Sequence, residues 1–488
     1  MKLSELIDGT DVARLEGCAD MEITNLDSDS RKITPGSLFV AIRGFETDGH
    51  KFIPAAAANG AAAFAVEEGV SFDRSAIPDS AAVVTVRNAR AFLARAACNF
   101  YGNPSRKFTL VGITGTSGKT TTSFMLKKIL EESGKKVGLI GTVAVYISGE
   151  KLKNSSRTTP ESLELQRLFV RMADEGVDAV VMEVSSQSLK LDRVLGCDFD
   201  VGVFTNLSRE HISKNEHPTM EDYFACKLKL FPMCRKVCTN TDDEKGREVA
   251  ARFAPVISFG LGENCDVRGS DVELTNRYIR FRLTAGGETS MVTVPMPTRF
   301  SVYNALAASS AAFALGIGRK AVEKALSEVR VPGRSELVDN DRGLAVIIDY
   351  AHIADSMESI LKEIRSATKG KLICVFGCGG DRDTSRRPLM GKVSGTLADM
   401  TILTQDNPRS ERTEDIIADI EAGVKEAGGQ YRIVIDRAEA IRTAIGMATT
   451  DDSVVLIGKG HETYQEIGHQ KFPFDEREVV RRITGRQA

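Results

Sequence analysis

The clearest chemical pattern in the chain is GTSGKTT, which covers the consecutive residues 115–121. It follows an apolar run at 108–114 and precedes a segment, 120–133, whose apolar residues recur at helical spacing. A turn between a strand and a helix collects backbone N–H groups at the positive helix end, which suits a triphosphate. In such a site Lys119 would neutralise the β- and γ-oxygens, and Thr120 would offer its hydroxyl to Mg²⁺. The strict pattern has glycine where this chain has Ile113, so a variant phosphate loop is predicted.

Polar residues also stand at the ends of two further apolar runs. Glu183 in MEVSSQ ends the run 179–183, and Asn206 and His211 in FTNLSREH follow the run 201–204. The carboxyl ends of parallel strands face one crevice, where a carboxylate and an imidazole can hold a second divalent cation. Alone, each is more typical of a hydrogen-bonding group. The phosphate loop alone is shared by GTPases, kinases, motors and ATP-dependent ligases.

The elements that must position these residues fall into three blocks. A chain of 488 residues suggests roughly three domains. We predict boundaries at 1–105, 106–333 and 334–488, because YGNPSRK and VPGRSE interrupt the periodic segments. The second block continues after the loop with a helix capped by Gly134 and a strand at 137–140, which makes a βαβ unit of a parallel sheet. The third alternates strands and helices, with strands at 344–349, 371–376, 400–404, 432–435 and 453–457.

The composition of the chain limits the kinds of partner that it can bind. The net charge of −3 gives no general attraction to nucleic acid or to an anionic membrane. The sequence has no apolar run of membrane-spanning length, and its first residues are too acidic for a signal peptide. Nine cysteines without CxxC pairs fit a reducing compartment. We therefore expect a cytoplasmic protein that neither enters a membrane nor binds nucleic acid.

Eleven motifs in order resemble the Mur ligases of bacterial peptidoglycan synthesis. They are TGTSGKTT, MEVSS, TNLSREH, YFACKLKLF, YNALAA, VPGRSE, DYAH, FGCGGDRD, RRPLMG, DNPR and GKGHE. The resemblance implies an α/β protein of three domains. These are an N-terminal domain for the UDP end of the substrate, a central P-loop-type ATPase domain with a parallel sheet, and a C-terminal Rossmann-like domain that binds the amino acid.

The resemblance also implies the reaction. A carboxylate of UDP-N-acetylmuramoyl-L-alanyl-D-glutamate attacks the γ-phosphate of ATP, and meso-diaminopimelate takes the acyl phosphate through its amine. This step belongs to cytoplasmic peptidoglycan precursor synthesis, on which cell wall biogenesis, cell shape and cell division depend. ATP and Mg²⁺ are the implied cofactors, and a monomer is expected.

Roles follow from the matching positions. Lys119, Glu183, His211 and Lys227 are implied as catalytic residues. The implied metal ligands are Thr120, Glu183, His211 and Lys227 as a carbamate, because a lysine turned into an anion can orient a cation. Taken alone, Lys227 is more typical of a solvated lysine on an amphipathic helix at 223–231. The implied nucleotide-binding residues are Gly115, Thr116, Ser117, Gly118, Lys119, Thr120, Thr121, Asn304 and Arg334, with Asp349, Tyr350 and His352 beside them.

The implied substrate contacts form three groups. Arginine reads carboxylates bidentately, so Arg409 of DNPR and Arg387 of RRPLMG are expected to recognise the extra carboxylate that distinguishes diaminopimelate from lysine. Alone, DNPR is equally typical of a simple turn. The amino-acid set is Arg387, Asp406, Asn407, Pro408, Arg409, Gly458 and Glu462. The uridine diphosphate set is Ser28, Ser30, Phe45, Glu46 and Thr47, and the muramoyl-peptide set is Thr158, Thr159, Ser185, Leu191 and Arg193.

Two alternatives stay open at the level of sequence. A folylpolyglutamate ligase, or a ligase that adds L-alanine or D-glutamate, would share the ATP loop, although DNPR and RRPLMG argue against it. A nucleotide-dependent binding protein without ligase chemistry would not need Lys119, Glu183, His211 and Lys227 together.

Overall fold

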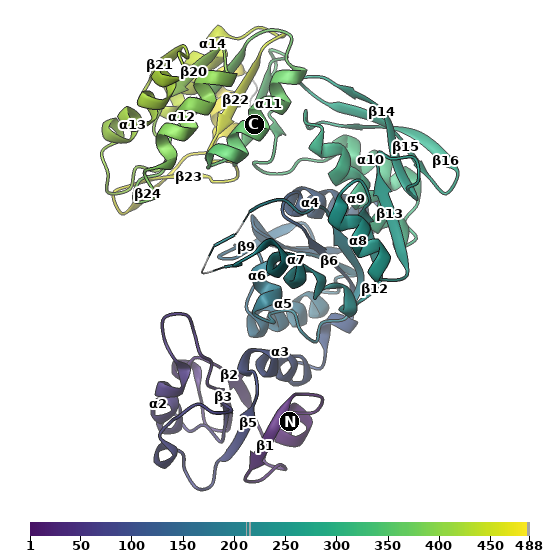
Figure 1. Cartoon of the computed structure of the whole chain (residues 1–488), viewed down its shortest axis with the longest axis vertical. Helices are drawn as coiled ribbons and strands as arrows, with labels where there is room; N and C mark the ends of the chain where they lie inside the picture. Colours follow the sequence, from purple (N-terminus) through teal and green to yellow (C-terminus); the bar gives the residue numbers. More distant parts are fainter. Residues whose placement is uncertain (211, 214–215, 486–488) are drawn as a thin grey trace. The chain divides into compact units, whose positions relative to one another are not determined.

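The structure is a computed structural model that describes residues 1–210, 212–213 and 216–485 (Figure 1). The chain divides into two compact units. The boundaries predicted near 105 and 333 stay predictions. The first unit contains Met1–Lys119, Ser133–Ser258 and Ala314–Gly316, and the second contains Thr120–Glu132, Phe259–Phe313 and the chain from Ile317 onward.

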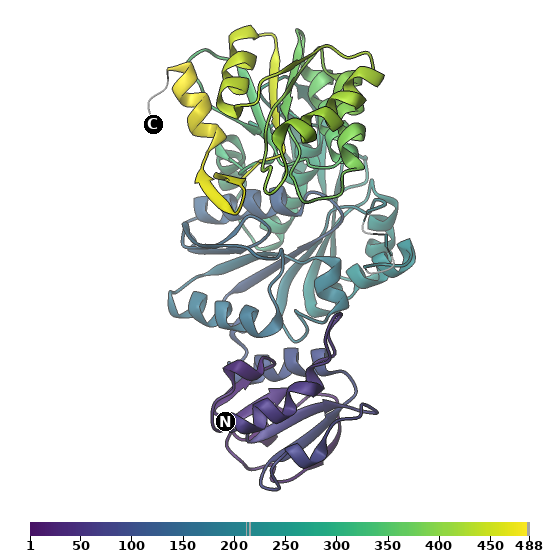
Figure 2. The ribbon, with the colours of Figure 1, turned by 90° about the vertical axis from the view of Figure 1, so that its left-hand side faces the viewer.

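The first unit begins with a five-stranded sheet, which is purple to dark blue in Figure 2. Its strand order is β1-β5-β4-β3-β2. Strands β2 to β5 are parallel, and β1 is antiparallel to β5. Alternate residues of β3 face opposite sides of the sheet, so Leu38 and Val40 share one apolar cluster while Phe39 belongs to another. The elements are α1 (Leu3–Leu6), β1 (Val12–Glu16), β2 (Asn25–Asp27), β3 (Ser37–Val40), α2 (Ile53–Ala58), β4 (Ala63–Glu67), β5 (Ala82–Val86) and α3 (Ala89–Phe100).

A second sheet in this unit has the order β12-β11-β6-β10-β7-β8-β9. Its first five strands are parallel, and β8 and β9 are antiparallel additions. Because β6 lies between β10 and β11, the segments that follow these three strands meet at one edge of the sheet. The elements are β6 (Thr109–Thr114), β7 (Val137–Ile140), β8 (Ala144–Ile147), β9 (Glu150–Asn154), α5 (Ser162–Asp174), β10 (Ala179–Glu183), α6 (Ser186–Lys190), β11 (Phe199–Phe204), α7 (Met220–Leu228), β12 (Cys234–Asn240) and α8 (Glu244–Arg252).

The second unit contains an antiparallel meander, β14 to β16, which the sequence patterns did not predict. Two residues of β13, Phe259 and Gly260, pair with the start of β14. The helix α4 begins at Lys119, directly after the phosphate loop. The elements are α4 (Lys119–Glu132), β13 (Val256–Gly260), β14 (Val267–Leu274), β15 (Ile279–Ala285), β16 (Glu288–Val294), α9 (Phe300–Ala314) and α10 (Arg319–Glu328).

The C-terminal part of the second unit is a six-stranded sheet in the order β17-β18-β22-β19-β20-β21, parallel except for β17. Helices α11 to α13 cover one face and α14 and α15 cover the other, as the two apolar clusters show. The elements are β17 (Glu336–Leu337), β18 (Ala345–Asp349), α11 (Ala354–Ala367), β19 (Leu372–Phe376), α12 (Arg386–Leu397), β20 (Met400–Leu403), α13 (Thr413–Glu426), β21 (Tyr431–Ile433), α14 (Arg437–Met447), β22 (Ser453–Ile457), the hairpin β23 (Tyr464–Ile467) and β24 (Gln470–Pro473), and α15 (Glu476–Thr484).

All nine cysteines have free thiols. Among the described residues, no helix combines the length and the apolar character needed to cross a bilayer.

Candidate active site

The loop after β6 has a backbone that only glycine accommodates. Gly115 has φ +149° and Gly118 has φ +86°. A Cβ atom on Gly115 would lie 1.9 Å from Oγ1 of Thr205, which donates to the carbonyl of Ser117 at 2.7 Å. The segment after β11 therefore braces the loop. Ile113 is fully buried in β6, which explains why an apolar residue replaces the glycine of the strict pattern.

Lys119 lies folded over this loop. Its Nζ donates to the carbonyl oxygens of Gly115 at 2.9 Å and Thr116 at 2.8 Å. In the second unit, Oγ1 of Thr122 donates to Oδ1 of Asn304 at 3.4 Å. The Lys119 ammonium thus belongs to the first residue of α4, the helix end where backbone N–H groups favour anions.

Lys227 of α7 is not a solvated lysine. The helix runs over Met220–Leu228 rather than over 223–231, and the residue is 1% exposed. Its Nζ donates to the carbonyl of Gly115 at 2.7 Å and lies 4.2 Å from the centre of the Tyr223 ring. Burial, followed by the charge of Lys119, holds the pKa of Lys227 well below its usual value. The phosphate loop and α7 are therefore in direct contact.

Glu183 ends β10 as a fully buried carboxylate. Its Oε1 accepts from the backbone N–H of Thr142 and its Oε2 from the hydroxyl of Thr142, both at 2.9 Å. The other predicted metal ligand of this edge, His211, lies outside the described residues. The carboxylate thus has a fixed orientation at the edge of the sheet where the phosphate loop begins.

A cavity of about 200 Å³, here called the loop cavity, lies within the first unit. Its lining combines residues predicted for the nucleotide (Lys119), for the muramoyl peptide (Thr158, Thr159, Ser185, Arg193) and Lys227. Leu191, the C-cap of α6, is not part of this lining. The sequence reasoning missed five lining residues: Ser186, Gln187, Glu216, His217 and Tyr223. Ser186 and Gln187 stand in the MEVSSQ motif, which was the available signal.

The predicted uridine diphosphate set lies in the N-terminal sheet. Ser28 and Ser30 follow β2, and Phe45, Glu46 and Thr47 follow β3, its parallel neighbour. The two segments thus leave the same edge of that sheet. Phe45 is 73% exposed, as expected of a side chain that could cover a ligand, but neither segment lines either cavity described here.

A second cavity of about 290 Å³, here called the DNPR cavity, lies in the second unit. Five residues predicted for the amino acid line it: Asp406, Asn407, Arg409, Gly458 and Glu462. Tyr350 and His352, expected beside the nucleotide, line it too, whereas Pro408 does not. The guanidinium of Arg334, which was expected at the nucleotide, lies 5.0 Å from the Tyr350 ring centre. Burial raises the pKa of Asp349, the carboxyl that precedes Tyr350.

Arg409 has an unusual backbone and two fixed side-chain contacts. Its φ is +51°, in the left-handed region. Its Nη1 donates to the carbonyl of Gly380 at 2.7 Å, and its Nε donates to Oε2 of Glu466 at 3.1 Å. Asn407 donates to Oε2 of Glu462 at 2.8 Å. DNPR is therefore a turn whose side chains are tied to the GKGHE segment and to the hairpin after it.

Arg387, which was predicted to bind the amino acid, does not line the DNPR cavity. The side chain is 2% exposed and donates to both carboxylate oxygens of Glu411, at 2.9 and 2.8 Å, and to Asp419 at 2.9 Å. Its neighbour Arg386 lines the DNPR cavity instead. One helical position turns a side chain by about 100°, and the motif does not reveal which arginine faces inward.

Comparisons with known proteins identify the family of the chain. Three family models match: the Mur ligase family catalytic domain at 22–101, the Mur ligase middle domain at 113–312, and the Mur ligase glutamate ligase domain at 333–460. A UDP-N-acetylmuramoyl-L-alanyl-D-glutamate–2,6-diaminopimelate ligase of Caldanaerobacter subterraneus subsp. tengcongensis is 45% identical, with 99% of each chain covered. The ligase of the same name from Clostridioides difficile is 42% identical, with 98% of this chain and 99% of the relative covered.

A solved structure also matches over the whole length. A structure of UDP-N-acetylmuramoyl-L-alanyl-D-glutamate–2,6-diaminopimelate ligase has a TM-score of 0.73 and 28% identity, with 99% of each chain covered. The three-part α/β architecture expected from the sequence is therefore confirmed. The chain belongs to the Mur ligase family.

Proposed function

We propose that this chain is an ATP-dependent amide ligase that adds meso-diaminopimelate to UDP-N-acetylmuramoyl-L-alanyl-D-glutamate in peptidoglycan precursor synthesis. The relatives carry this activity in their names. The observation that carries the proposal is the loop cavity, because Lys119, Lys227 and the four residues expected at the peptide line one hollow. A phosphate donor and a peptide carboxylate would meet there.

The nucleotide belongs to the phosphate loop. Backbone N–H groups at the start of α4 and the Lys119 ammonium provide donors and positive charge for a triphosphate. Thr120 and Glu183 offer oxygen ligands, the donor type that Mg²⁺ prefers, and Glu183 is held in place by Thr142. When bound, Mg²⁺ would offset the charge that builds up on the phosphate oxygens. The proposal thus assigns Thr120 and Glu183, with His211, to the metal.

The peptide carboxylate has to approach another anion. Lys119 and Arg193 place two cationic side chains in the lining of the loop cavity, and their charge reduces the repulsion between carboxylate and triphosphate. Phosphorylation of the carboxylate gives an acyl phosphate, whose phosphate leaves when the amine attacks. The contribution of these residues is to orient the reactants and to stabilise negative charge.

Lys227 is proposed to act as a carbamate. It is buried against the phosphate loop, where an ammonium would repel a metal ion and an anion would attract one. Addition of CO₂ to the neutral amine forms a C–N bond and releases one proton, which converts the side chain into an oxygen donor. The assignment matches the position in YFACKLKLF.

The DNPR cavity is proposed to bind diaminopimelate. Arg409 and Arg386 line it as cations, and Asp406 and Glu462 line it as carboxylates. Diaminopimelate has an amine and a carboxylate at its far end, so its binding site needs both anionic and cationic side chains. Lysine lacks the second carboxylate, so the arginines would discriminate against it.

The remaining assignments complete the proposal. The segments at Ser28, Ser30 and 45–47 would hold the uridine diphosphate, and Asn304 and Arg334 would contribute to the nucleotide site. We propose domain boundaries near 105 and 333, action as a monomer and a cytoplasmic location, with which nine free thiols agree.

The test is phosphate release by the purified chain. ATP hydrolysis should require Mg²⁺, the UDP-dipeptide and the amine together, and meso-diaminopimelate should react much faster than lysine at equal concentration. Nucleotide consumption without the UDP-dipeptide, or equal rates with both amines, would contradict the proposal.

A further inference from the structure

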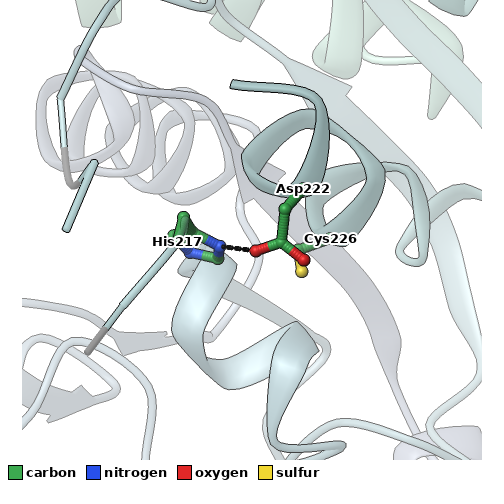
Figure 3. Close-up of side chains that lie close together, drawn as sticks. All are labelled: His217, Asp222 and Cys226. Carbon is green, nitrogen blue, oxygen red and sulfur yellow. Dashed lines mark hydrogen bonds and ion pairs between the residues drawn. The ribbon is translucent and has the colours of Figure 1, made fainter. Parts of the chain in front are cut away.

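The lining of the loop cavity includes Ser186 and His217, which form a hydrogen-bonded group with Asp222. His217 is 1% exposed, its Nδ1 lies 2.8 Å from Oδ2 of Asp222, and its Nε2 lies 3.0 Å from Oγ of Ser186. Figure 3 shows the imidazole and the Asp222 carboxylate facing each other, with Cys226 further along α7. Ser186 and His217 both line the cavity.

A metal ion explains this group less well than hydrogen bonding does. One ligand atom each of His217, Asp222 and Cys226 lies within 4.8 Å of the others. Both ring nitrogens, however, already have hydrogen-bond partners, and the ammonium of Lys190 lies 3.1 Å from Asp222. Burial also raises the pKa of the Cys226 thiol, which disfavours the thiolate that metals bind.

The partners fix the direction of the hydrogen bonds. A carboxylate only accepts, so Nδ1 of His217 carries the proton and donates to Asp222. Burial lowers the pKa of His217 and keeps the ring neutral, which leaves Nε2 as an acceptor. The Ser186 hydroxyl must then donate its only proton to Nε2. Among the described residues Ser186 Oγ has no second hydrogen-bond partner, so its lone pairs remain available to the cavity.

A neighbouring acceptor points to the same ligand chemistry. Oε1 of Gln187 is buried, lines the cavity through its residue, and has no hydrogen-bond partner within the described part of the chain. Lys119 and Arg193 supply charge for anions elsewhere in the lining. Buried acceptors without partners are costly unless a ligand supplies the donor.

We propose that Ser186 is a further substrate-binding residue, whose oxygen accepts the amide N–H of the D-glutamyl residue, and that His217 and Asp222 are positioning residues that keep it an acceptor. The inference rests on the proposed function, because it takes the UDP-dipeptide as the ligand. The incoming amine is the other possible N–H donor, and the kinetic experiment separates the two.

The kinetic experiment compares Ser186→Ala with Ser188→Ala. Ser188 is a matched control on α6, because its hydroxyl bonds the Ser185 carbonyl at 2.6 Å and does not line the cavity. Ser186→Ala should raise the KM for the UDP-dipeptide about 5- to 10-fold, the range of one hydrogen bond, while the KM values for ATP and diaminopimelate change less than about twofold. A depsipeptide analogue with an ester oxygen in place of that N–H should raise the KM of the wild type by a similar factor. The same analogue should not raise the KM of Ser186→Ala any further.

Other results would overturn the assignment. These are a KM rise confined to the amine, an equal penalty from the ester in both enzymes, or equal effects of the two serine variants. Absence of ligation by the wild type would instead end the proposed function.

A spectroscopic readout is independent of turnover. The chain has six histidines, so ¹⁵N NMR of the imidazoles, with His217→Gln for assignment, can identify the His217 signal in the intact protein. The neutral Nδ1–H form is expected at neutral pH. An Nε2–H form would make Ser186 a donor to the cavity and refute the proposal, even if Ser186→Ala did not fold.

Discussion

The loop cavity and the DNPR cavity are built in different ways. In the loop cavity the critical contacts go to the backbone, since Lys119 and Lys227 both donate to the carbonyl of Gly115. In the DNPR cavity side chains hold one another: Arg409 bonds Glu466, and Asn407 bonds Glu462. The first arrangement depends on one continuous turn, and the second depends on charged side chains from three separate segments, 382–386, 406–409 and 462–466.

This difference determines what substitutions should do. A backbone-built site loses its geometry when the turn changes, so many substrates should be affected together. A side-chain-built site can lose one contact and keep the others, so the effect should be confined to the KM of one substrate.

The largest expected effect is that of Lys227→Ala, which should abolish ligation. A short carboxylate such as acetate or formate should partly restore it by supplying the missing anion, whereas Lys227→Arg should not respond in this way. Rates of phosphate release, measured with and without the added carboxylate, provide the check. Lys229→Ala is the matched control, because the side chain of that lysine is half exposed and contacts the carbonyl of Leu189 and the carboxylate of Asp192. Full activity of Lys227→Ala would refute the carbamate assignment.

Arg409→Ala should raise the KM for diaminopimelate, because the substrate carboxylate loses its guanidinium partner. The rise should correspond to about 2 to 5 kcal/mol of binding free energy, the cost of removing one partner of a charge pair. The KM for ATP and that for the UDP-dipeptide should stay within about twofold, because Arg409 does not line the loop cavity. Arg412→Ala, at a side chain that is 75% exposed, is the control. An unchanged KM for diaminopimelate would remove the basis for selectivity.

Gly115→Ala should reduce kcat/KM by about 100-fold, as a displacement of reacting groups by about 1 Å can. The new Cβ would lie 1.9 Å from Oγ1 of Thr205 and 3.1 Å from the backbone nitrogen of Asn206. Gly134→Ala also places a side chain at a positive φ, +89°, but its Cβ would meet no described residue beyond its chain neighbours within 4 Å. This control therefore shows the effect of backbone strain without a clash. Steady-state kinetics with each substrate varied should show losses that are not confined to one KM.

The contrast also explains what could be predicted from the sequence. GTSGKTT is one continuous motif between a strand and a helix, so the phosphate loop and Lys119 were predictable, and β10 was predicted with the bounds that it has. The meander β14 to β16 was missed, because alternating residues with many exposed positions gave no continuous apolar run. The burial of Lys227 was not predicted, because a nine-residue helix gives little information on which of its faces is covered. Its role as a carbamate was implied by the family resemblance alone.

Ser186 and His217 show why some residues of the site could not be predicted from the sequence. The residues lie 31 positions apart in the chain, and nothing in either local pattern indicates that they meet. Only the sheet order, which places β10 and β11 on either side of β6, brings their following segments together. Contacts between segments are a property of topology rather than of local spacing.

The smallest expected effect distinguishes two adjacent arginines. Arg387→Ala should lower the free energy of unfolding by about 1 to 3 kcal/mol, because it removes hydrogen bonds to two carboxylates, and should leave the KM for diaminopimelate unchanged. Arg386→Ala removes a cation from the lining of the DNPR cavity. It should therefore raise the KM for diaminopimelate and leave the free energy of unfolding nearly unchanged. Chemical denaturation and steady-state kinetics on both variants provide the two measurements, and a KM effect confined to Arg387→Ala would restore the prediction made from the sequence.

The pH dependence of that stability difference adds a check on its cause. Hydrogen bonds from Arg387 hold the pKa of Glu411 below its ordinary value, so the folded state binds the proton less tightly than the unfolded state does. The stabilisation is therefore complete above the unfolded pKa of about 4.3 and is lost as the pH falls through the folded pKa. Unfolding free energies of the wild type and of Arg387→Ala should converge below about pH 4. A difference that stays constant down to pH 3 would assign the effect to lost packing of the arginine stem rather than to its charge.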